Sequence, residues 1–150
     1  GAQLAPVIGL GIAQDRNLQA PVANAHGVSI EWLRLPPGGG VSRHRLADKQ
    51  VLIAAQGRLG VGVETTAGTR AYELIGSDSA WDSFSLPPDE WRTITNRGDT
   101  DALALLLTAG DHRNAIDWEA ATVRAAAAQD LALDASGFVA AKRFVDRAQR

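Results

Sequence analysis

The chain has 150 residues, of which 45% are hydrophobic and 21% are charged, and its formal net charge at pH 7 is −2. These values are typical of one ordinary globular domain and argue against an intrinsically disordered chain. They also exclude the broad positive field that nucleic-acid binding normally needs. No apolar run in the sequence approaches the ~18 residues of a membrane-spanning helix. We therefore expect neither a nucleic acid nor a membrane as partner.

The sequence contains no cysteine. Disulfides, thiolate nucleophiles and zinc–thiolate sites are therefore all excluded. The first residues do not combine a basic start with a continuous apolar stretch, as a secretory signal would. We therefore expect a cytoplasmic protein.

Short apolar segments separated by turn residues make up roughly the first 115 residues. Residues 59–63 alternate Leu, Gly, Val, Gly and Val, a period of two that is typical of a strand in a crowded sheet. Clusters of glycine and proline at 36–40 and 86–89 interrupt the apolar segments, as turns do. Many short strands at this spacing predict an antiparallel sandwich or barrel formed by about residues 26–110.

The last third of the chain predicts a helical appendage at about residues 114–150. Asp117 is placed to cap a helix that includes the alanines 125–128. A second helix is predicted over 136–149, where apolar residues are spaced to form one stripe. No linker-like run separates this part from the β region, so we expect residues 1–150 to form a single domain.

Residues 38–57 carry a spaced pattern of glycine and polar residues. The pattern consists of Gly38, His44, Leu46, Gln50 and Gly57. Its spacing resembles the first motif of the cupin superfamily, in which a glycine precedes His-x-His, a glutamate and a second glycine.

Residues 87–96 resemble the second cupin motif. Pro87 and Asn96 match that motif, whereas Asp89 and Arg92 stand where a glycine and a histidine are usual. The two motifs lie in the family's order with an apolar segment between them. The resemblance covers about residues 28–109 and implies an antiparallel jelly-roll barrel with its site inside, usually in a dimer.

In cupins the positions of His44, Leu46, Gln50 and Arg92 hold a metal through three imidazoles and one carboxylate. Only His44 keeps the family's residue type. Leu46 has no donor atom, Gln50 is uncharged, and Arg92 is a permanent cation. Transition metals need three or four N, O or S ligands. The sequence therefore indicates a divergent cupin without a metal, and we expect no other cofactor.

Strand periodicity independently predicts that His44 and Gln50 share one face, as Arg92 and Asn96 do. His44 is the candidate acid or base, and Arg92 is the candidate group for binding a carboxylate or phosphate. Gln50, Trp32 and Tyr72 are further candidate ligand contacts.

The structural alternative for His44 is an inert, hydrogen-bonded interior residue. For Arg92 it is an ion pair with an acidic neighbour such as Glu31 or Glu73, or an orientation toward solvent. For the aromatic residues it is simple packing in the core or in an interface.

Three functions remain open at this level. The favoured one is a metal-independent, non-catalytic module that binds a small, anionic organic molecule. Such a module could serve a regulatory role. The second is a metal-independent isomerase, epimerase or cyclase with His44 as general base, assisted by Asp48, Asp82 or Tyr72. The third is a structural interaction domain that depends on its C-terminal helices.

Self-association is expected as well. The cupin resemblance implies a homodimer. In addition, both faces of the predicted strands around Val51, Ile53 and 103–107 carry apolar residues. Only one face of each strand can pack in the core, so we expect the other to be buried against a second subunit.

Overall fold

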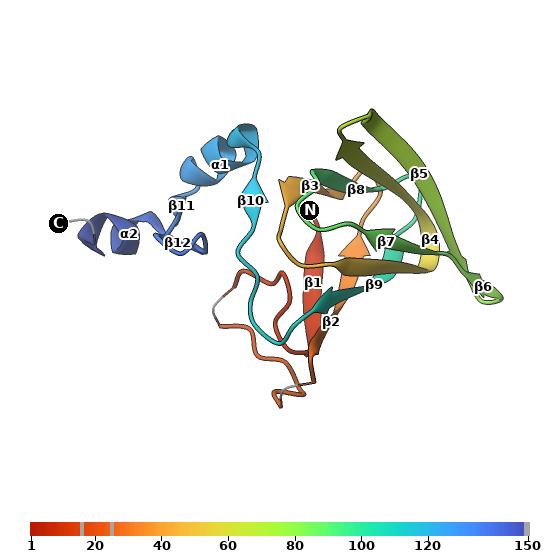
Figure 1. The fold of residues 1–150 in the computed structure, drawn as a ribbon, viewed down its shortest axis with the longest axis horizontal. Helices are drawn as coiled ribbons and strands as arrows, with labels where there is room; N and C mark the ends of the chain where they lie inside the picture. Colours follow the sequence, from red (N-terminus) through yellow and green to blue (C-terminus); the bar gives the residue numbers. More distant parts are fainter. Residues whose placement is uncertain (16, 25, 149–150) are drawn as a thin grey trace.

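The computed structural model describes residues 1–15, 17–24 and 26–148. A curled antiparallel sheet forms the body of the protein, and a smaller unit with two short helices and a two-stranded ribbon extends from it (Figure 1). The prediction of an all-β, antiparallel fold with two C-terminal helices is confirmed. No helix among the described residues is long and apolar enough to cross a membrane.

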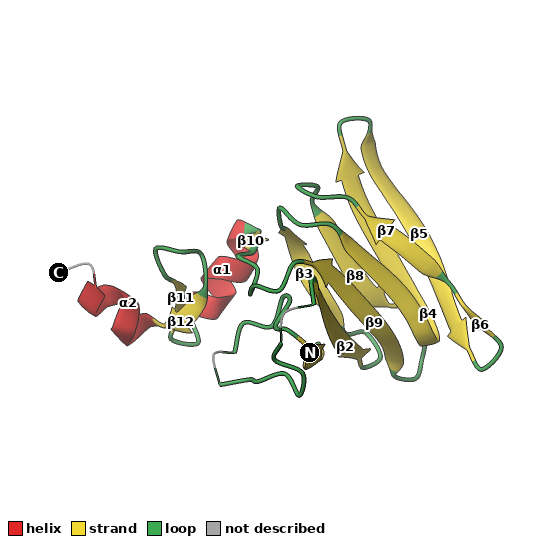
Figure 2. Cartoon of the chain, turned by 60° about the horizontal axis from the view of Figure 1, so that its bottom comes forward, coloured by secondary structure: helices red, strands yellow, loops and turns green. Residues whose placement is uncertain are grey.

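Ten strands make up the curled sheet. They are β1 (Gln3–Ile8), β2 (Val28–Leu35), β3 (Gly40–Arg45), β4 (Gln50–Thr65), β5 (Gly68–Ser77), β6 (Ala80–Trp81), β7 (Ser83–Leu86), β8 (Arg92–Asn96), β9 (Ala102–Ala109) and β10 (Asp117–Trp118). The main path runs β1-β2-β9-β4-β8-β3-β10, while β5 and β7 pair with β4 and β6 pairs with β5. Figure 2 shows most of these strands side by side, with the smaller unit beyond one end of the sheet.

The long strand β4 joins the two halves of the sheet. Its first half pairs with β7 and β9, and its second half pairs with β5 and β8. The change of partners follows a β-bulge between Ala54 and Gln56 and occurs at Gly57, whose φ is +83°. A side chain at Gly57 would also lie 3.1 Å from the Cα atom of Ala102. Glycine is therefore required there both by conformation and by space.

Alternation along the strands supplies the core. On β9, for example, Ala102, Ala104 and Leu106 are fully buried, whereas the residues between them are half-buried. The inward apolar side chains of both halves form one cluster, which includes Leu33, Leu35, Leu52, Leu59, Val61, Leu86, Ile94 and Leu106. The curled sheet is thus a filled barrel and not an open channel.

Apolar side chains also cover the outer face of β2, β9 and the first half of β4. Trp32 lies opposite Leu105 of β9, and Leu105 lies opposite Ile53 of β4. Trp32 and Val51 are 37% and 36% exposed. An antiparallel sheet usually carries polar residues on the face that meets water. We therefore expect a second copy of the chain to cover this outer face.

The Leu105→Lys variant is expected to be a monomer, because a charge at the centre of an apolar interface disfavours association. Light scattering at micromolar concentration should give twice 15.8 kDa for the unmodified chain and 15.8 kDa for the variant. Thr69→Lys, at the exposed β4–β5 hairpin, serves as the control and should remain dimeric. An unmodified chain that stays at 15.8 kDa at every concentration would contradict the expectation.

The structure corrects the start of the sheet and of the first helix. β1 adds to the edge of β2, with Leu4 opposite Leu33, so the sheet begins well before residue 26. Asp117 does not cap a helix, because it lies in β10 and its carboxylate accepts a hydrogen bond from Arg45 Nε at 2.9 Å. Helix α1 (Ala120–Ala127) begins after Glu119, which makes no side-chain capping bond.

The appendage is also less helical than predicted. Residues 136–141 form a turn and strand β12 (Val139–Ala141), which pairs with β11 (Leu131–Leu133), and helix α2 (Lys142–Ala148) begins only afterwards. Asp134 Oδ1 accepts hydrogen bonds from the amides of Ser136 and Phe138, and Gly137 has a φ of +80°. These local bonds favour a hairpin turn over a helix at this point. Gln149, the predicted end of the helix, lies outside the described residues.

Candidate functional site

Polar side chains occupy inward positions of the barrel where apolar ones are expected. They are Ser29 and Glu31 of β2, Thr108 of β9, Gln50 of β4, Arg92 of β8 and His44 of β3, none of them more than 1% exposed. Thr108 lies opposite both Ser29 and Gln50, and Arg92 lies opposite His44. A buried polar cluster of this size in a small barrel marks a candidate site, because polar groups are costly to bury without a role.

Arg92 is held inside the barrel by three oxygen atoms. Its Nε donates to the carbonyl oxygen of Glu90 at 3.1 Å, and its Nη2 donates to that of Pro87 at 2.6 Å. Its Nη1 donates to Gln50 Oε1 at 3.2 Å, and Gln50 Nε2 in turn donates to Thr108 Oγ1 at 2.9 Å. Because β8 and the start of β4 lie in opposite halves of the sheet, the bond between Arg92 and Gln50 crosses the barrel interior.

The positive charge of Arg92 has no ion-pair partner among the described residues. The two acidic candidates have other partners: Glu73 pairs with Arg58, and Glu31 accepts hydrogen bonds from backbone amides. Burial lowers the pKa of Arg92 to about 10, partly opposed by the charges of Asp89 and Glu90, so the guanidinium stays cationic at neutral pH. A guanidinium has five N–H donors, and the three bonds above leave one on each terminal nitrogen for a further acceptor.

His44 lies beside Arg92 and is fully buried. Its Nδ1 lies 2.7 Å from the carbonyl oxygen of Ser42, which can only accept, so Nδ1 carries the proton. Burial, with a smaller contribution from the charge of Arg92, lowers the pKa of His44 to about 4 against the opposing effect of the Ser42 bond. His44 is therefore neutral at physiological pH. Its Nε2 has no hydrogen-bond partner among the described residues.

Two segments pack against these groups, one around β10 and one near the N-terminus. The ring of Trp118, which pairs with His44 through β10, lies 5.4 Å from the imidazole. Ile116 and Ile12 are each 2% exposed and belong to the core cluster. The N-terminal segment is fixed by the Glu31 carboxylate, which accepts from the amides of Ile12 and Ala13 at 2.9 Å each.

The carboxyl group of Glu31 is itself perturbed. Burial raises its pKa to about 7, even though the two amide hydrogen bonds from Ile12 and Ala13 favour the charged form. Glu31 therefore changes its charge near neutral pH while it holds the N-terminal segment.

Of the residues that the sequence predicted as ligand contacts, the structure brings His44, Gln50 and Arg92 together. Trp32 lies on the outer face of β2 and lines an outer pocket with Arg34 and Leu103. Tyr72 is 37% exposed and packs its ring 4.5 Å from that of Phe84.

The predicted assistants of His44 lie elsewhere as well. Asp48 binds His112, with Oδ2 and Nε2 3.0 Å apart, and Asp82 accepts a hydrogen bond from the amide of Ile75.

Four residues of the site were missed by the sequence reasoning, namely Ser29, Glu31, Thr108 and Trp118. Thr108 follows Ala102, Ala104 and Leu106 at a period of two, so its inward position was available from alternation alone. Trp118 carried no such signal, because its place over His44 depends on the pairing of β10 with β3.

The residues at the family's metal positions do not fit a transition metal. Leu46 has no donor atom, Gln50 is engaged with Arg92 and Thr108, and Arg92 brings a positive charge to the position of a ligand. His44 Nε2 alone has a free lone pair of suitable chemistry. The described residues also contain no group of three or more His, Cys, Asp or Glu that could hold a metal ion.

Comparison with known proteins gives a likeness in structure only. No protein-family model matches the chain, and no curated protein matches it. A structure of oxalate oxidase matches all of the chain over 66% of its own length, with a TM-score of 0.64 and 15% identity. A recombinant oxalate oxidase in complex with glycolate matches 79% of the chain over 55% of its own length, with a TM-score of 0.61 and 18% identity.

A Lactobacillus farciminis oxalate decarboxylase in a formate complex also matches. It covers 67% of the chain and 29% of its own length, with a TM-score of 0.58 and 18% identity. The chain therefore spans only part of the proteins that it resembles. At these identities the likeness shows a shared fold.

Proposed function

Because this chain has the cupin jelly-roll fold, we propose that it is a metal-independent cupin that binds a small anionic organic molecule inside its barrel. The observation that carries the proposal is the state of Arg92, which is buried, cationic and without a carboxylate partner among the described residues. His44 and Gln50 lie beside it and complete the polar surface that the ligand would meet.

The energetics of Arg92 support an anionic ligand. A buried charge without a counter-charge costs several kcal/mol, and a bound anion would offset that cost. The remaining N–H groups of the two terminal nitrogens suit the two oxygens of a carboxylate or phosphate. The similar structures with glycolate and formate, both small carboxylates, favour a carboxylate for this chain as well.

An enzyme with His44 as general base has less support. A pKa of about 4 makes the imidazole a weak base at neutral pH. Asp48, Asp82 and Tyr72, the candidate assistants, have partners away from His44.

One observation favours a second candidate, a structural interaction domain. Leu46 is 3% exposed and fills part of the barrel interior. A protein of this kind needs no ligand, and it would bind its partner through its outer apolar face. The two candidates differ in whether an anion stabilises the protein.

Small carboxylates and inorganic phosphate should raise the melting temperature of the unmodified chain and have little effect on the Arg92→Gln variant. Binding to the native state alone adds about 2.7 kcal/mol at a ligand concentration of 100 Kd, which is several degrees in a domain of this size. A thermal-shift series with acetate, glycolate, formate and phosphate at constant ionic strength measures this.

Arg34→Gln is the matched control, because Arg34 is an exposed arginine that pairs with Asp101. It should keep the full anion effect. An unmodified chain that no anion stabilises would favour the interaction domain, and an equal shift in Arg92→Gln would remove Arg92 from the site.

A further inference from the structure

The strongest unexplained feature of the site is the lone pair on His44 Nε2. The side chain is fully buried, and this nitrogen has no hydrogen-bond partner among the described residues. A buried acceptor without a donor costs about 1–3 kcal/mol. Such an atom usually meets a water or a ligand that donates a hydrogen bond to it.

The chemistry of that partner is restricted by the tautomer. Since Nδ1 donates to the carbonyl oxygen of Ser42 at 2.7 Å, Nε2 is the unprotonated nitrogen and can only accept. Burial keeps the ring neutral at physiological pH. The partner must therefore bring its own donor, and an ionised carboxylate group alone has none.

The second requirement comes from the neighbouring strand. His44 of β3 and Arg92 of β8 lie directly opposite each other and both point inward. Side chains in such a pair have Cβ atoms about 4.5–5.5 Å apart. One small molecule that contacts both side chains therefore meets an acceptor on His44 and cationic donors on Arg92.

We propose that the ligand of this site is a small hydroxy acid, whose carboxylate is bound by Arg92 and whose hydroxyl group donates a hydrogen bond to His44 Nε2. This inference rests on the proposed function and specifies its ligand class. It also gives the buried Nε2 of the neutral His44 a hydrogen-bond donor. The ligand is small, because His44 and Arg92 are both fully buried and the ring of Trp118 packs 5.4 Å from that of His44.

Glycolate and acetate form the matched pair of probes, since they differ only by the hydroxyl group. Isothermal titration at pH 7 should show glycolate binding to the unmodified chain at least about tenfold more tightly than acetate, the factor that corresponds to one well-made hydrogen bond. The His44→Asn variant should lose this preference and bind glycolate and acetate with similar affinity. Asn retains an N–H at the position of Nδ1, which can still donate to Ser42, and lacks any atom at the position of Nε2.

His112→Asn is the control for a histidine elsewhere, because His112 is an exposed residue paired with Asp48. It should keep the preference for glycolate. If His44→Asn fails to fold, ¹⁵N NMR of the histidine rings in the unmodified chain replaces it: the Nε2 signal of His44 should move with glycolate and not with acetate.

The outcomes separate the two proposals. Equal binding of glycolate and acetate, both dependent on Arg92, would overturn the hydroxy-acid inference and leave the anion-binding function standing. A preference for glycolate that persists in His44→Asn would also overturn it. Binding of neither probe, together with no anion-dependent stabilisation, would overturn the proposed function itself.

Discussion

In the Glu31→Gln variant, the free energy of unfolding is expected to rise by about 3 kcal/mol between pH 4.5 and pH 6.5, whereas in His44→Asn it is expected to fall by a similar amount. The unmodified chain should be nearly independent of pH over the same range as far as these two groups are concerned. The reason is that two buried groups titrate in opposite directions.

The effect of Glu31 follows from its raised pKa. Between its ordinary value of 4.5 and about 7, the folded state binds a proton that the unfolded state has released. Stability from this group is therefore present below pH 4.5 and is lost as the pH rises to about 7. In His44→Asn, this decrease in the free energy of unfolding with rising pH is the only contribution of the two groups that remains.

The effect of His44 follows from its lowered pKa. Between about 4 and its ordinary value of 6.5, the unfolded state binds a proton that the folded state excludes. Stability from this group is therefore present above pH 6.5 and is lost as the pH falls to about 4. In Glu31→Gln, this increase in the free energy of unfolding with rising pH is the only contribution of the two groups that remains.

Urea unfolding followed by circular dichroism at several pH values measures both slopes. Each variant also loses a constant amount of stability, since Gln accepts from only one of the two amides that Glu31 satisfies, and this loss does not change with pH. Exposed carboxylates act equally in all three proteins and cancel in the differences. Parallel curves for all three proteins would show that neither buried group titrates as inferred.

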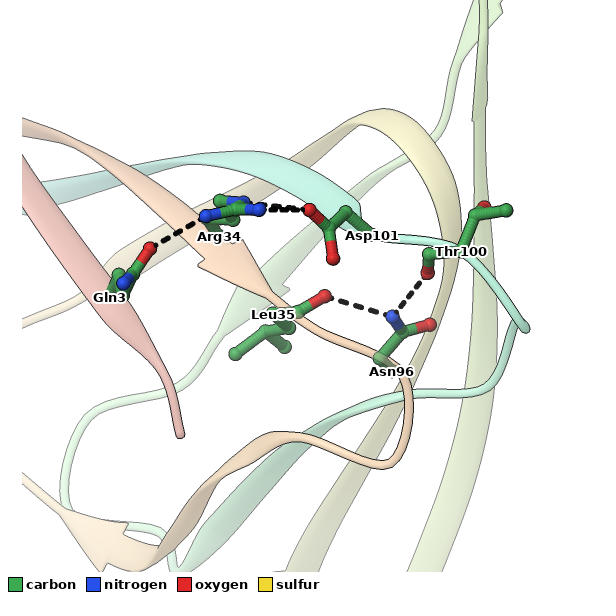
Figure 3. Close-up of polar contacts among 6 residues, drawn as sticks. All are labelled: Gln3, Arg34, Leu35, Asn96, Thr100 and Asp101. Atoms are coloured by element: carbon green, nitrogen blue, oxygen red, sulfur yellow. Dashed lines mark hydrogen bonds and ion pairs between the residues drawn. The ribbon is translucent and has the colours of Figure 1, made fainter.

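The Asn96→Ala variant is expected to lose about 3 kcal/mol of stability, roughly 1 kcal/mol for each of three hydrogen bonds. Asn96 ends β8, is 6% exposed and ties the following turn to β2 (Figure 3). Its Nδ2 donates to the carbonyl oxygens of Leu35 and Thr100 at 2.9 and 2.7 Å, and its Oδ1 accepts from the amide of Gly98 at 2.8 Å.

Asn96→Asp sharpens the test, because the new side chain has the same shape. Its carboxylate can still accept from Gly98 but cannot donate to two carbonyl oxygens, so at pH 7 the loss should equal or exceed that of Asn96→Ala. Gln3→Ala, which removes an exposed bond to Arg34 in the same region (Figure 3), should change stability by no more than about 0.5 kcal/mol. A tolerated Asn96→Asp would show that the two donated bonds contribute little.

The sequence determined the class of fold and the central part of the site. Alternation in β8 and β9 shows which side chains share a face, because successive residues of a strand point to opposite sides. Together with the spacing of the two motifs, it places Arg92, His44 and Gln50 inside the barrel. The chemistry of these residue types was enough to argue against a metal.

Alternation could not decide which face of a strand points inward where both are apolar. In β2, Ser29, Glu31 and Leu33 point inward and Trp32 points out, although a buried tryptophan beside an exposed glutamate is the usual arrangement. The amides of Ile12 and Ala13 stabilise the buried carboxylate of Glu31 by donating hydrogen bonds to it. They come from a segment 19 and 18 residues away in the chain.

Only the tertiary structure decided what surrounds the two central groups. The lack of an ion pair of Arg92 among the described residues, and the position of Trp118 beside His44, depend on pairings between distant strands. Sequence spacing carries little information about such pairings, because they are set by which faces the closed barrel brings together. The same holds for the free Nε2 of His44, since hydrogen-bond satisfaction depends on every neighbour in space.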